Sequence, residues 1–297
     1  MASIAFLGLG NMGGPMARNL HAAGHRVRGF DPSAAAMAAA VERGIEEAES
    51  LAAACRDAEV VFTMLPAGQH VREAYLGEGG ILVSAPGDAL LIDCSTIDVG
   101  TAREVHQAAA DAGFLMLDAP VSGGVAGAEA GKLTLMVGGP EVAFEKARPY
   151  LQIVGAKVVH AGAAGNGQVA KVCNNMMLGI SMIAVSEAFN LAEKLGLEAG
   201  KLFEIASAAS GSCWAMLNHH PLPGIVETSA ANRDYKPGFA AAMMHKDLRL
   251  AQEAAAAAGC ATPLGAEAMQ LYSLFVNAGH GELDYSAIIR LIQGKAV

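Results

Sequence analysis

The chain has 297 residues, of which 53% are hydrophobic and only 16% are charged, and its formal net charge at pH 7 is −9. An apolar chain of this length is expected to form two compact domains, and its composition excludes a largely disordered protein. The acidic balance, without any cluster of Lys and Arg that could follow a phosphate backbone, argues against a nucleic-acid partner.

The first half of the chain alternates short apolar runs with helix-like segments. The runs predicted as strands are Ile4–Leu7, Arg26–Phe30, Val60–Met64, Leu90–Asp93, Phe114–Asp118, Leu133–Val137 and Lys157–His160. Helices are predicted between most of them, for instance over Pro15–Ala23, Ala34–Arg43 and Val99–Ala112. Strands that alternate with helices are typical of parallel βαβ units. We therefore predict an α/β fold, with a doubly wound dinucleotide-binding domain of the Rossmann type over residues 1–163.

No strand pattern returns after Gly167. The predicted helices there are Gln168–Leu195, Ala199–Ala209, Phe239–Ala258, Pro263–Ala278 and Tyr285–Ile292, and residues 219–238, rich in Pro and Gly, are predicted as a surface loop. Residues 164–297 should thus form an all-α domain that begins with a long connecting helix. That helix is apolar almost all round, which predicts contacts on more than one side. Its Asn and Ser residues and its flanks favour a helix buried in protein over a membrane span.

Three further features place limits on the type of protein. The five cysteines are odd in number and form no CxxC pair, which favours reduced thiols in a cytoplasmic enzyme. The first residues lack the basic start of a signal peptide. None of the nine histidines is spaced with a nearby carboxylate as metal ligands are, so no metal site is predicted.

A glycine-rich turn follows the first predicted strand. Gly8-Leu9-Gly10-Asn11-Met12-Gly13 fits the pattern G-x-G-x-x-G, with a strand before it and a helix after it. In such a loop the glycines allow a tight turn and a close approach to a pyrophosphate, which the positive end of the helix attracts. Asp31, at the end of the second strand, would accept hydrogen bonds from ribose hydroxyls and repel a 2′-phosphate. The spacing predicts NAD as cofactor, although Arg26 and Arg28 on the same strand leave NADP open, and a structural turn without a ligand is the alternative.

The long helix carries an isolated polar cluster. Lys171, Asn174 and Asn175 are spaced i, i+3 and i+4, so they share one face, and Gly167 leaves room one turn earlier. Hydride transfer from an alcohol requires a base for the hydroxyl proton, and a lysine can serve when burial lowers its pKa. The competing interpretation is an extended surface lysine beside two structural amides.

In four motifs, which follow one another along the sequence, the chain resembles the 3-hydroxyisobutyrate dehydrogenase family of β-hydroxyacid dehydrogenases. The motifs are Phe6–Gly13, Asp118–Gly124, Gly167–Asn175 and Lys246–Leu248. The resemblance implies a Rossmann domain, a long connecting helix and an all-α domain that forms the interface of a homodimer or homotetramer. It also implies that Lys171 is the catalytic lysine and that Asn175 steadies the substrate or the lysine. The remaining implied contacts are Ser122, Gly123, Gly124 and Lys246 for the substrate, and Leu65, Pro66 and Thr96 for the nicotinamide side of the cofactor.

The resemblance favours an NAD-dependent oxidation of 3-hydroxyisobutyrate to methylmalonate semialdehyde, a step of valine catabolism. L-serine, tartronate semialdehyde and succinic semialdehyde are alternative substrates for the same chemistry, and a non-catalytic dinucleotide-binding scaffold is an alternative of another class. One segment departs from the family pattern. The chain has Gly211-Ser212-Cys213-Trp214 where close family members often have Gly-Gly-Asn-Trp, which leaves the substrate open.

Overall fold

The computed structural model describes residues 1–295, and contacts within the chain divide it into unit 1, Met1–Lys171, and unit 2, Val172–Val297. The division falls inside the long helix α9 (Asn166–Lys194) rather than before it. The prediction set the boundary at the start of that helix. The first turn of α9 belongs with unit 1 because its polar groups bond to the strand ends of the sheet.

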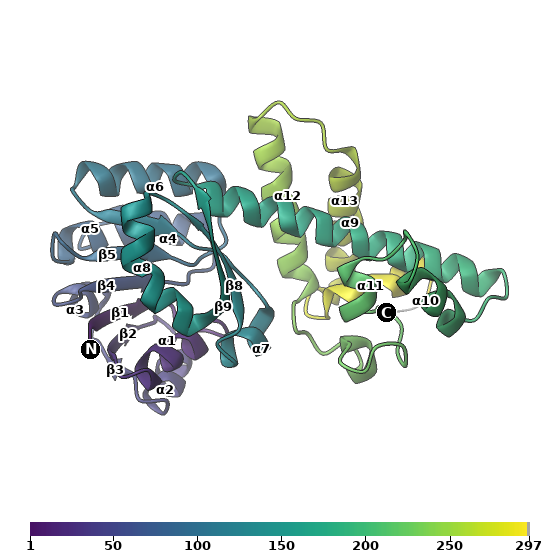
Figure 1. The fold of residues 1–297 in the computed structure, drawn as a ribbon, viewed down its shortest axis with the longest axis horizontal. Coiled ribbons are helices and arrows are strands. Elements are labelled where there is room, and N and C mark those ends of the chain that lie inside the picture. The colour runs from purple at the N-terminus through teal and green to yellow at the C-terminus, as the bar shows by residue number, and fades with distance from the viewer. Residues whose placement is uncertain (296–297) are drawn as a thin grey trace. The chain divides into compact units, whose positions relative to one another are not determined.

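A single sheet forms the centre of unit 1 (Figure 1). Its strands are β1 (Ser3–Leu7), β2 (Arg26–Phe30), β3 (Glu46–Glu47), β4 (Val60–Thr63), β5 (Leu90–Asp93), β6 (Leu115–Asp118), β7 (Val121–Ser122), β8 (Leu133–Gly138) and β9 (Gly155–Gly162). The order across the sheet is β3-β2-β1-β4-β5-β6-β8-β7, and β9 pairs with β8. In this sheet order, the strands β3, β2, β1, β4, β5 and β6 are all parallel to one another. This arrangement confirms the predicted doubly wound fold.

One edge of the sheet differs from the parallel pattern. Strand β8 runs antiparallel to β6 and β7. Only the short helix α7 (Gly124–Glu129) and its flanking turns separate β7 from β8, and a parallel crossover needs a dozen or more residues. The chain therefore turns back instead of crossing over. The two-residue strands β3 and β7 were not predicted.

Two layers of helices cover the two faces of the sheet (Figure 1). Helices α1 (Gly13–Ala22), α2 (Ala34–Val41), α7 and α8 (Glu141–Val154) pack on one face. The other face carries α3 (Leu51–Cys55), α4 (Gly68–Leu76), α5 (Ile81–Ser84) and α6 (Val99–Asp111). Successive residues of a strand point to opposite faces of the sheet. Phe6 therefore packs in the core under α1 and α8, and Leu7 packs in the core under α4 and α6. Burial on both faces explains why the central strands are continuous apolar runs.

Unit 2 is helical. Besides the remainder of α9 it contains α10 (Ala199–Ser207), α11 (Trp214–Asn218), a 3-10 turn (Ala230–Arg233), α12 (Ala241–Ala257), α13 (Pro263–Phe275), a π-helical turn (Val276–His280), a second 3-10 turn (Tyr285–Ala287) and α14 (Ile288–Ile292). Its main core joins α9, α12 and α13 through side chains such as Met182, Met244 and Tyr272. Helix α11 lies where no helix was predicted.

The segment 219–238 is only partly a surface loop. His220 and Ser229 are fully buried, and the hydroxyl of Tyr235 donates to the carbonyl of Pro221 at 2.8 Å. Asp284 accepts hydrogen bonds from the backbone N–H groups of Gly238 and Phe239, so α12 begins two residues later than predicted. The prediction of a surface loop was therefore wrong for the buried residues of this segment, because a Pro- and Gly-rich composition indicates turns and not exposure.

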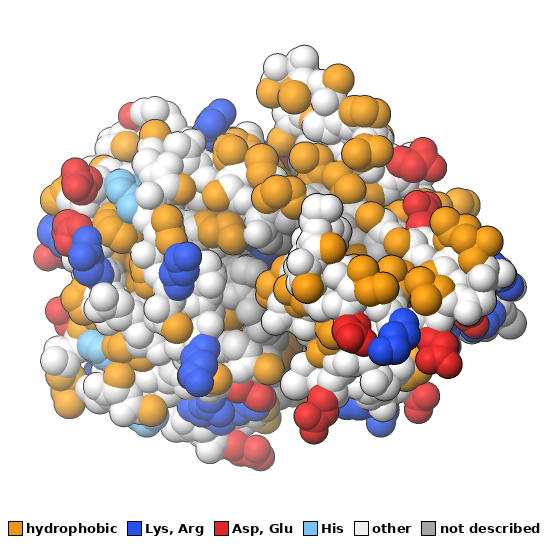
Figure 2. Space-filling view, turned by 45° about the vertical axis from the view of Figure 1, so that its right-hand side comes forward, with side chains coloured by type: hydrophobic (Ala, Val, Ile, Leu, Met, Phe, Trp, Pro, Cys, Tyr) orange, Lys and Arg blue, Asp and Glu red, His pale blue; other side chains and the backbone are white. Residues whose placement is uncertain are grey.

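Helix α9 is long and apolar enough to cross a membrane by length and composition, yet 44% of its most apolar window is buried inside the protein. Phe189 is buried, whereas Met177 and Leu191 on the same helix are about 60% exposed. Leu195, Leu264 and Leu274 of unit 2 are also exposed, and hydrophobic side chains gather on the surface of this unit in Figure 2. Exposed apolar side chains that gather on one surface are typical of a binding face.

Candidate active site

The glycine loop after β1 is a tight backbone turn that has no room for side chains at two of its three glycines. Gly8 has a φ of +88°, and a Cβ atom there would lie 2.3 Å from the carbonyl oxygen of Met64. A Cβ atom on Gly13 would lie 1.9 Å from the carbonyl oxygen of Gly8, whereas at Gly10 it would meet open space. Helix α1 begins at Gly13 without a side-chain cap, so its N-terminus can receive an anion. Asn11 and Met12 complete the loop. These features fit the pyrophosphate of a dinucleotide.

Asp31 lies at the end of β2, directly beside this loop. One carboxylate oxygen accepts a hydrogen bond from the backbone N–H of Leu9 at 2.7 Å, and the other accepts from Ser33 at 2.8 Å. The carboxylate is thereby fixed at the position expected for an acceptor of ribose hydroxyls. The two arginines of β2 have other partners. Arg26 forms an ion pair with Glu46 at 2.8 Å, and Arg28 donates to the carbonyl of Ala53 at 3.1 Å. Both observations favour NAD over NADP.

The loops after β4 and β5 bring the other predicted cofactor residues to the same edge of the sheet. Leu7, Thr63 and Asp93 end three adjacent parallel strands in register, so the loops that follow them start side by side. The backbone N–H of Leu65 donates to the hydroxyl of Ser95 at 2.8 Å. Pro66 is exposed and Thr96 is half-buried. Ligands of open α/β sheets bind beyond the carboxyl ends of the strands, where these residues lie.

Two buried carboxylates terminate β5 and β6 in register with each other. Asp93 accepts hydrogen bonds from Thr63 at 2.7 Å and from the backbone N–H of Ser95 at 3.1 Å. Burial raises the pKa of Asp93, and these hydrogen bonds partly oppose the rise. Asp118 accepts hydrogen bonds from the backbone N–H groups of Gly165 and Gln168 at 2.8 and 2.9 Å. Asp118 therefore holds the start of α9.

Lys171 lies beside the predicted carboxylate-binding segment within unit 1. Its side chain is 7% exposed, and its amine donates to the carbonyl oxygen of Val121 at 2.8 Å. Val121 directly precedes Ser122, Gly123 and Gly124, and these glycines have φ values of +134° and +61°. Such left-handed conformations suit glycine and turn the backbone after Ser122 sharply. The structure thus places the amine of Lys171 on the residue that directly precedes this segment.

Gly167 serves close packing rather than ligand entry. A Cβ atom there would lie 2.4 Å from the carbonyl oxygen of Met136 and 2.6 Å from that of Asp118. The helix therefore lies directly on the sheet at this point, which fixes Lys171 one turn later. The room that Gly167 was expected to leave on this face is filled by the backbone of the sheet.

The predicted residues of unit 2 form a hydrogen-bonded group of their own. The amide of Asn174 donates to Asn175, whose amide in turn donates to Asp247 of α12 at 2.5 Å. The amine of Lys246 lies 3.6 Å from the other oxygen of Asp247. Asp247 was not among the predicted site residues. It is 3% exposed, and its position next to Lys246 in a quoted motif was the available signal.

The segment that departs from the family pattern surrounds the start of α11. Cys213 is half-buried, and Trp214 is 58% exposed with its ring stacked on that of His219. The ring of His219 lies 2.7 Å from Asp284. Of the two residues that replace the family's usual ones, Cys213 packs against the cores of unit 2, whereas Ser212 is exposed.

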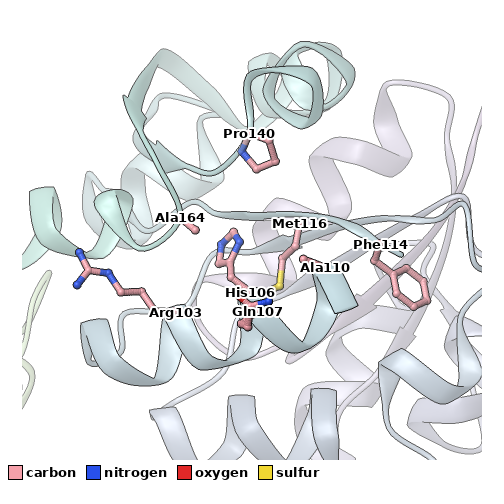
Figure 3. A pocket seen from close by; sticks show the side chains of 8 residues that line it. All are labelled: Arg103, His106, Gln107, Ala110, Phe114, Met116, Pro140 and Ala164. Carbon is pink, nitrogen blue, oxygen red and sulfur yellow. The ribbon is translucent and has the colours of Figure 1, made fainter. Parts of the chain in front are cut away.

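A hollow of about 300 Å³ lies on another part of unit 1 (Figure 3). Arg103 and His106 of α6 line it together with Phe114 and Pro140. The ring of His106 lies 3.0 Å from Asp118. None of the predicted site residues lines this hollow.

Known proteins match the chain over both units. A family model described as the NAD binding domain of 6-phosphogluconate dehydrogenase matches residues 3–162, and one described as NAD-binding of NADP-dependent 3-hydroxyisobutyrate dehydrogenase matches residues 165–292. A relative from Mycobacterium tuberculosis, named "Probable 3-hydroxyisobutyrate dehydrogenase", is 52% identical over 100% of this chain and 99% of its own length. A 3-hydroxyisobutyrate dehydrogenase of Pseudomonas aeruginosa is 51% identical over 99% of this chain and 100% of its own length.

Two further matches bear on the substrate. An NAD-dependent L-serine dehydrogenase of Pseudomonas aeruginosa is 48% identical over 98% of each chain. The solved structure of Mycobacterium tuberculosis 3-hydroxyisobutyrate dehydrogenase with L-serine has a TM-score of 0.95 and 52% identity, and covers 99% of each chain.

Proposed function

Because the chain belongs to the 3-hydroxyisobutyrate dehydrogenase family of NAD-dependent β-hydroxyacid dehydrogenases, we propose that it oxidises 3-hydroxyisobutyrate to methylmalonate semialdehyde, with Lys171 as the proton acceptor. The observation that carries this proposal is the buried amine of Lys171, bonded to Val121 next to Ser122. This position supplies a base beside a backbone segment suited to a carboxylate. The second candidate substrate is L-serine, which the relative of 48% identity supports.

The residues of this chain would hold NAD at the glycine loop Gly8–Gly13, at Asp31, and at Leu65, Pro66 and Thr96. Bound NAD supplies the hydride acceptor. The hydroxyl and backbone N–H groups of Ser122, Gly123 and Gly124 bind the substrate carboxylate, and Asn175 and Lys246 provide further substrate contacts. The contact between Asp247 and Asn175 restrains the amide of Asn175.

The proton step follows from the position of Lys171. The substrate hydroxyl gives its proton to the neutral amine as the carbon gives up a hydride, and the electrons of the O–H bond form the carbonyl. In the reverse direction the same amine returns the proton to the alkoxide. The hydrogen bond from the amine to Val121 fixes the side chain during both steps. A proton acceptor held in place in this way contributes about 10²–10⁴ to the rate.

Initial rates test the substrate: NADH formation with each hydroxy acid at saturating NAD, and NADH consumption with each semialdehyde at saturating NADH. We expect the highest kcat/KM for 3-hydroxyisobutyrate, with L-serine second and reductions of tartronate semialdehyde and succinic semialdehyde slower. A higher value for L-serine would replace the first candidate with the second. An enzyme inactive on the whole panel would favour a dinucleotide-binding scaffold.

The Lys171→Ala variant tests the mechanism. We expect kcat to fall by about 10²–10⁴, while NADH binding measured by fluorescence stays within a few-fold of wild type. Lys146→Ala, at an exposed lysine of α8, is the control and should keep wild-type turnover. Turnover of Lys171→Ala near that of the control would remove Lys171 from the reaction.

The exposed apolar side chains of unit 2 support self-association into a homodimer or homotetramer. Leu191→Glu and Leu274→Glu, analysed by light scattering after size exclusion, should lower the mass in solution if this surface is the interface. A cytoplasmic location and the absence of nucleic-acid, membrane and metal partners stay predictions from composition.

A further inference from the structure

Gln168 is a buried polar residue at the start of α9 whose side chain no predicted function uses. It is fully buried and lies one turn before Lys171. A buried amide is costly unless its donor and acceptor both find partners. Its partners therefore indicate what the residue holds in place.

The side-chain amide of Gln168 binds the backbone on both sides of Thr96. Its nitrogen donates to the carbonyl oxygen of Ser95 at 2.7 Å, and its oxygen accepts from the backbone N–H of Ile97 at 3.2 Å. Thr96, predicted to contact the nicotinamide side of the cofactor, is thus clamped between two hydrogen bonds from a single side chain on α9.

The clamp continues to the neighbouring loop. The hydroxyl of Ser95 accepts from the backbone N–H of Leu65 at 2.8 Å, and the backbone N–H of Ser95 donates to Asp93 at 3.1 Å. The two loops predicted to face the nicotinamide are therefore connected to each other and, through Gln168, to α9.

The backbone of Gln168 is fixed as firmly as its side chain. Its N–H donates to Asp118 at 2.9 Å, and the packing of Gly167 on the sheet prevents α9 from sliding. Lys171, on the next turn, has its own bond to Val121. Connected hydrogen bonds thus hold α9, the loops after β4 and β5, and Lys171 in fixed positions relative to one another.

We infer that Gln168 is a positioning residue for the dehydrogenase reaction, which sets the lysine amine relative to the cofactor loops that carry Leu65 and Thr96. The inference rests on the proposed function. A displacement of about 1 Å between reacting groups can lower the rate about 100-fold. Loss of the clamp should therefore act on the chemical step rather than on the affinity for NAD.

Two variants separate this role from simple stability. Gln168→Met keeps the size of the side chain but removes both hydrogen bonds. Gln168→Glu retains the acceptor for Ile97, and only its protonated form can also donate to Ser95. Because burial favours the neutral carboxylic acid, the activity of Gln168→Glu relative to wild type should rise as the pH is lowered.

The matched control is Ser186→Ala, at a fully buried residue of the same helix whose hydroxyl has no hydrogen-bond partner among the described residues. Each protein is assayed with 3-hydroxyisobutyrate and with the substrate deuterated at the carbon that bears the hydroxyl. We expect Gln168→Met to lower kcat by about 10- to 100-fold and to raise the deuterium isotope effect on kcat, with NADH affinity changed less than threefold. Ser186→Ala should match wild type in all three measurements.

A readout without cofactor completes the test. Hydrogen exchange of the Ile97 amide in the unliganded protein should accelerate at least tenfold in Gln168→Met and stay unchanged in Ser186→Ala. Unchanged kcat and isotope effect in a folded Gln168→Met, or a pH-independent activity ratio for Gln168→Glu, would overturn the inference while the proposed function stands. A wild-type enzyme inactive on the substrate panel would refute the proposed function, and the inference with it.

Discussion

His220 makes the stability of unit 2 dependent on pH. Its ring is fully buried, with the rings of Phe189 and Phe203 at centroid distances of 4.4 and 5.7 Å. Its Nδ1 atom accepts a hydrogen bond from the backbone N–H of Leu222 at 3.1 Å, so the neutral ring carries its proton on Nε2. Burial lowers the pKa of His220 from 6.5 to about 4, because a charged ring would lose its hydration among these side chains.

The sign of the effect follows from the two states. The unfolded chain binds a proton at His220 near pH 6.5, whereas the folded chain binds it only near pH 4. The stability that the neutral ring contributes is complete above pH 6.5 and is lost progressively as the pH falls from 6.5 towards 4. Between pH 7 and pH 5 this linkage amounts to about 2 kcal/mol of the free energy of unfolding.

The variant His220→Asn removes the titration and keeps an acceptor for the N–H of Leu222. We expect it to be less stable than wild type at pH 7, because the smaller side chain leaves a cavity. Its free energy of unfolding, measured by urea denaturation at pH 7, 6 and 5, should fall by about 2 kcal/mol less than that of wild type. His70→Asn, at an exposed histidine of α4, should keep the wild-type pH dependence. Parallel curves for wild type and His220→Asn would refute the argument.

Three other predictions follow from single contacts. Asp31→Ala should raise the KM for NAD about 10- to 100-fold, because it removes a charged hydrogen-bond acceptor. It should also narrow the preference for NAD over NADP, measured by initial rates with both cofactors. An unchanged preference would contradict the role of Asp31 as an acceptor of ribose hydroxyls. Ellman's reagent should modify the exposed Cys173 and Cys260 in the native protein, whereas Cys55, whose pKa burial raises to about 12, should react only after unfolding, as peptide mass spectrometry would show. Asp284→Ala should lower the free energy of unfolding in urea by about 3–5 kcal/mol, since the ring and backbone donors around this buried carboxylate would lose their acceptor, and a loss below 1 kcal/mol would show that water replaces it.

The strands of unit 1 were predictable because their signal is local. Arg26–Phe30 and Leu90–Asp93 begin and end where the sequence placed them. Continuous apolar runs bounded by polar residues suffice for strands buried on both faces. The strand Val121–Ser122 was not predictable, since two residues have no periodicity and this strand exists through its pairing with β8. Its position matters to the site, because its first residue supplies the carbonyl that binds Lys171.

The residues of the candidate site also divide into those that the sequence could predict and those that it could not. The glycine loop and Asp31 could be predicted because a contiguous motif and a strand end specify their geometry. The partner of Asn175 could not, since Asp247 lies 72 residues further along the chain. The resemblance placed Lys246 in the site. Only the packing of α9 against α12 within unit 2 shows that Asp247, next to Lys246, binds the amide of Asn175.

Gln168 is the residue that the sequence argument could have reached and did not. Residues 168, 171 and 175 follow the spacing i, i+3 and i+7, so the polar face of α9 extends one turn before Lys171. The energetic rule that singled out Lys171 in an apolar helix, namely that buried polar groups need partners, applies equally to Gln168. The partners then distinguish the two amides. Asn175 bonds to side chains, which can reorient, whereas Gln168 bonds to backbone atoms that the strand ends hold in place. A side chain bonded in that way has little freedom to move and is suited to fixing the position of its neighbours.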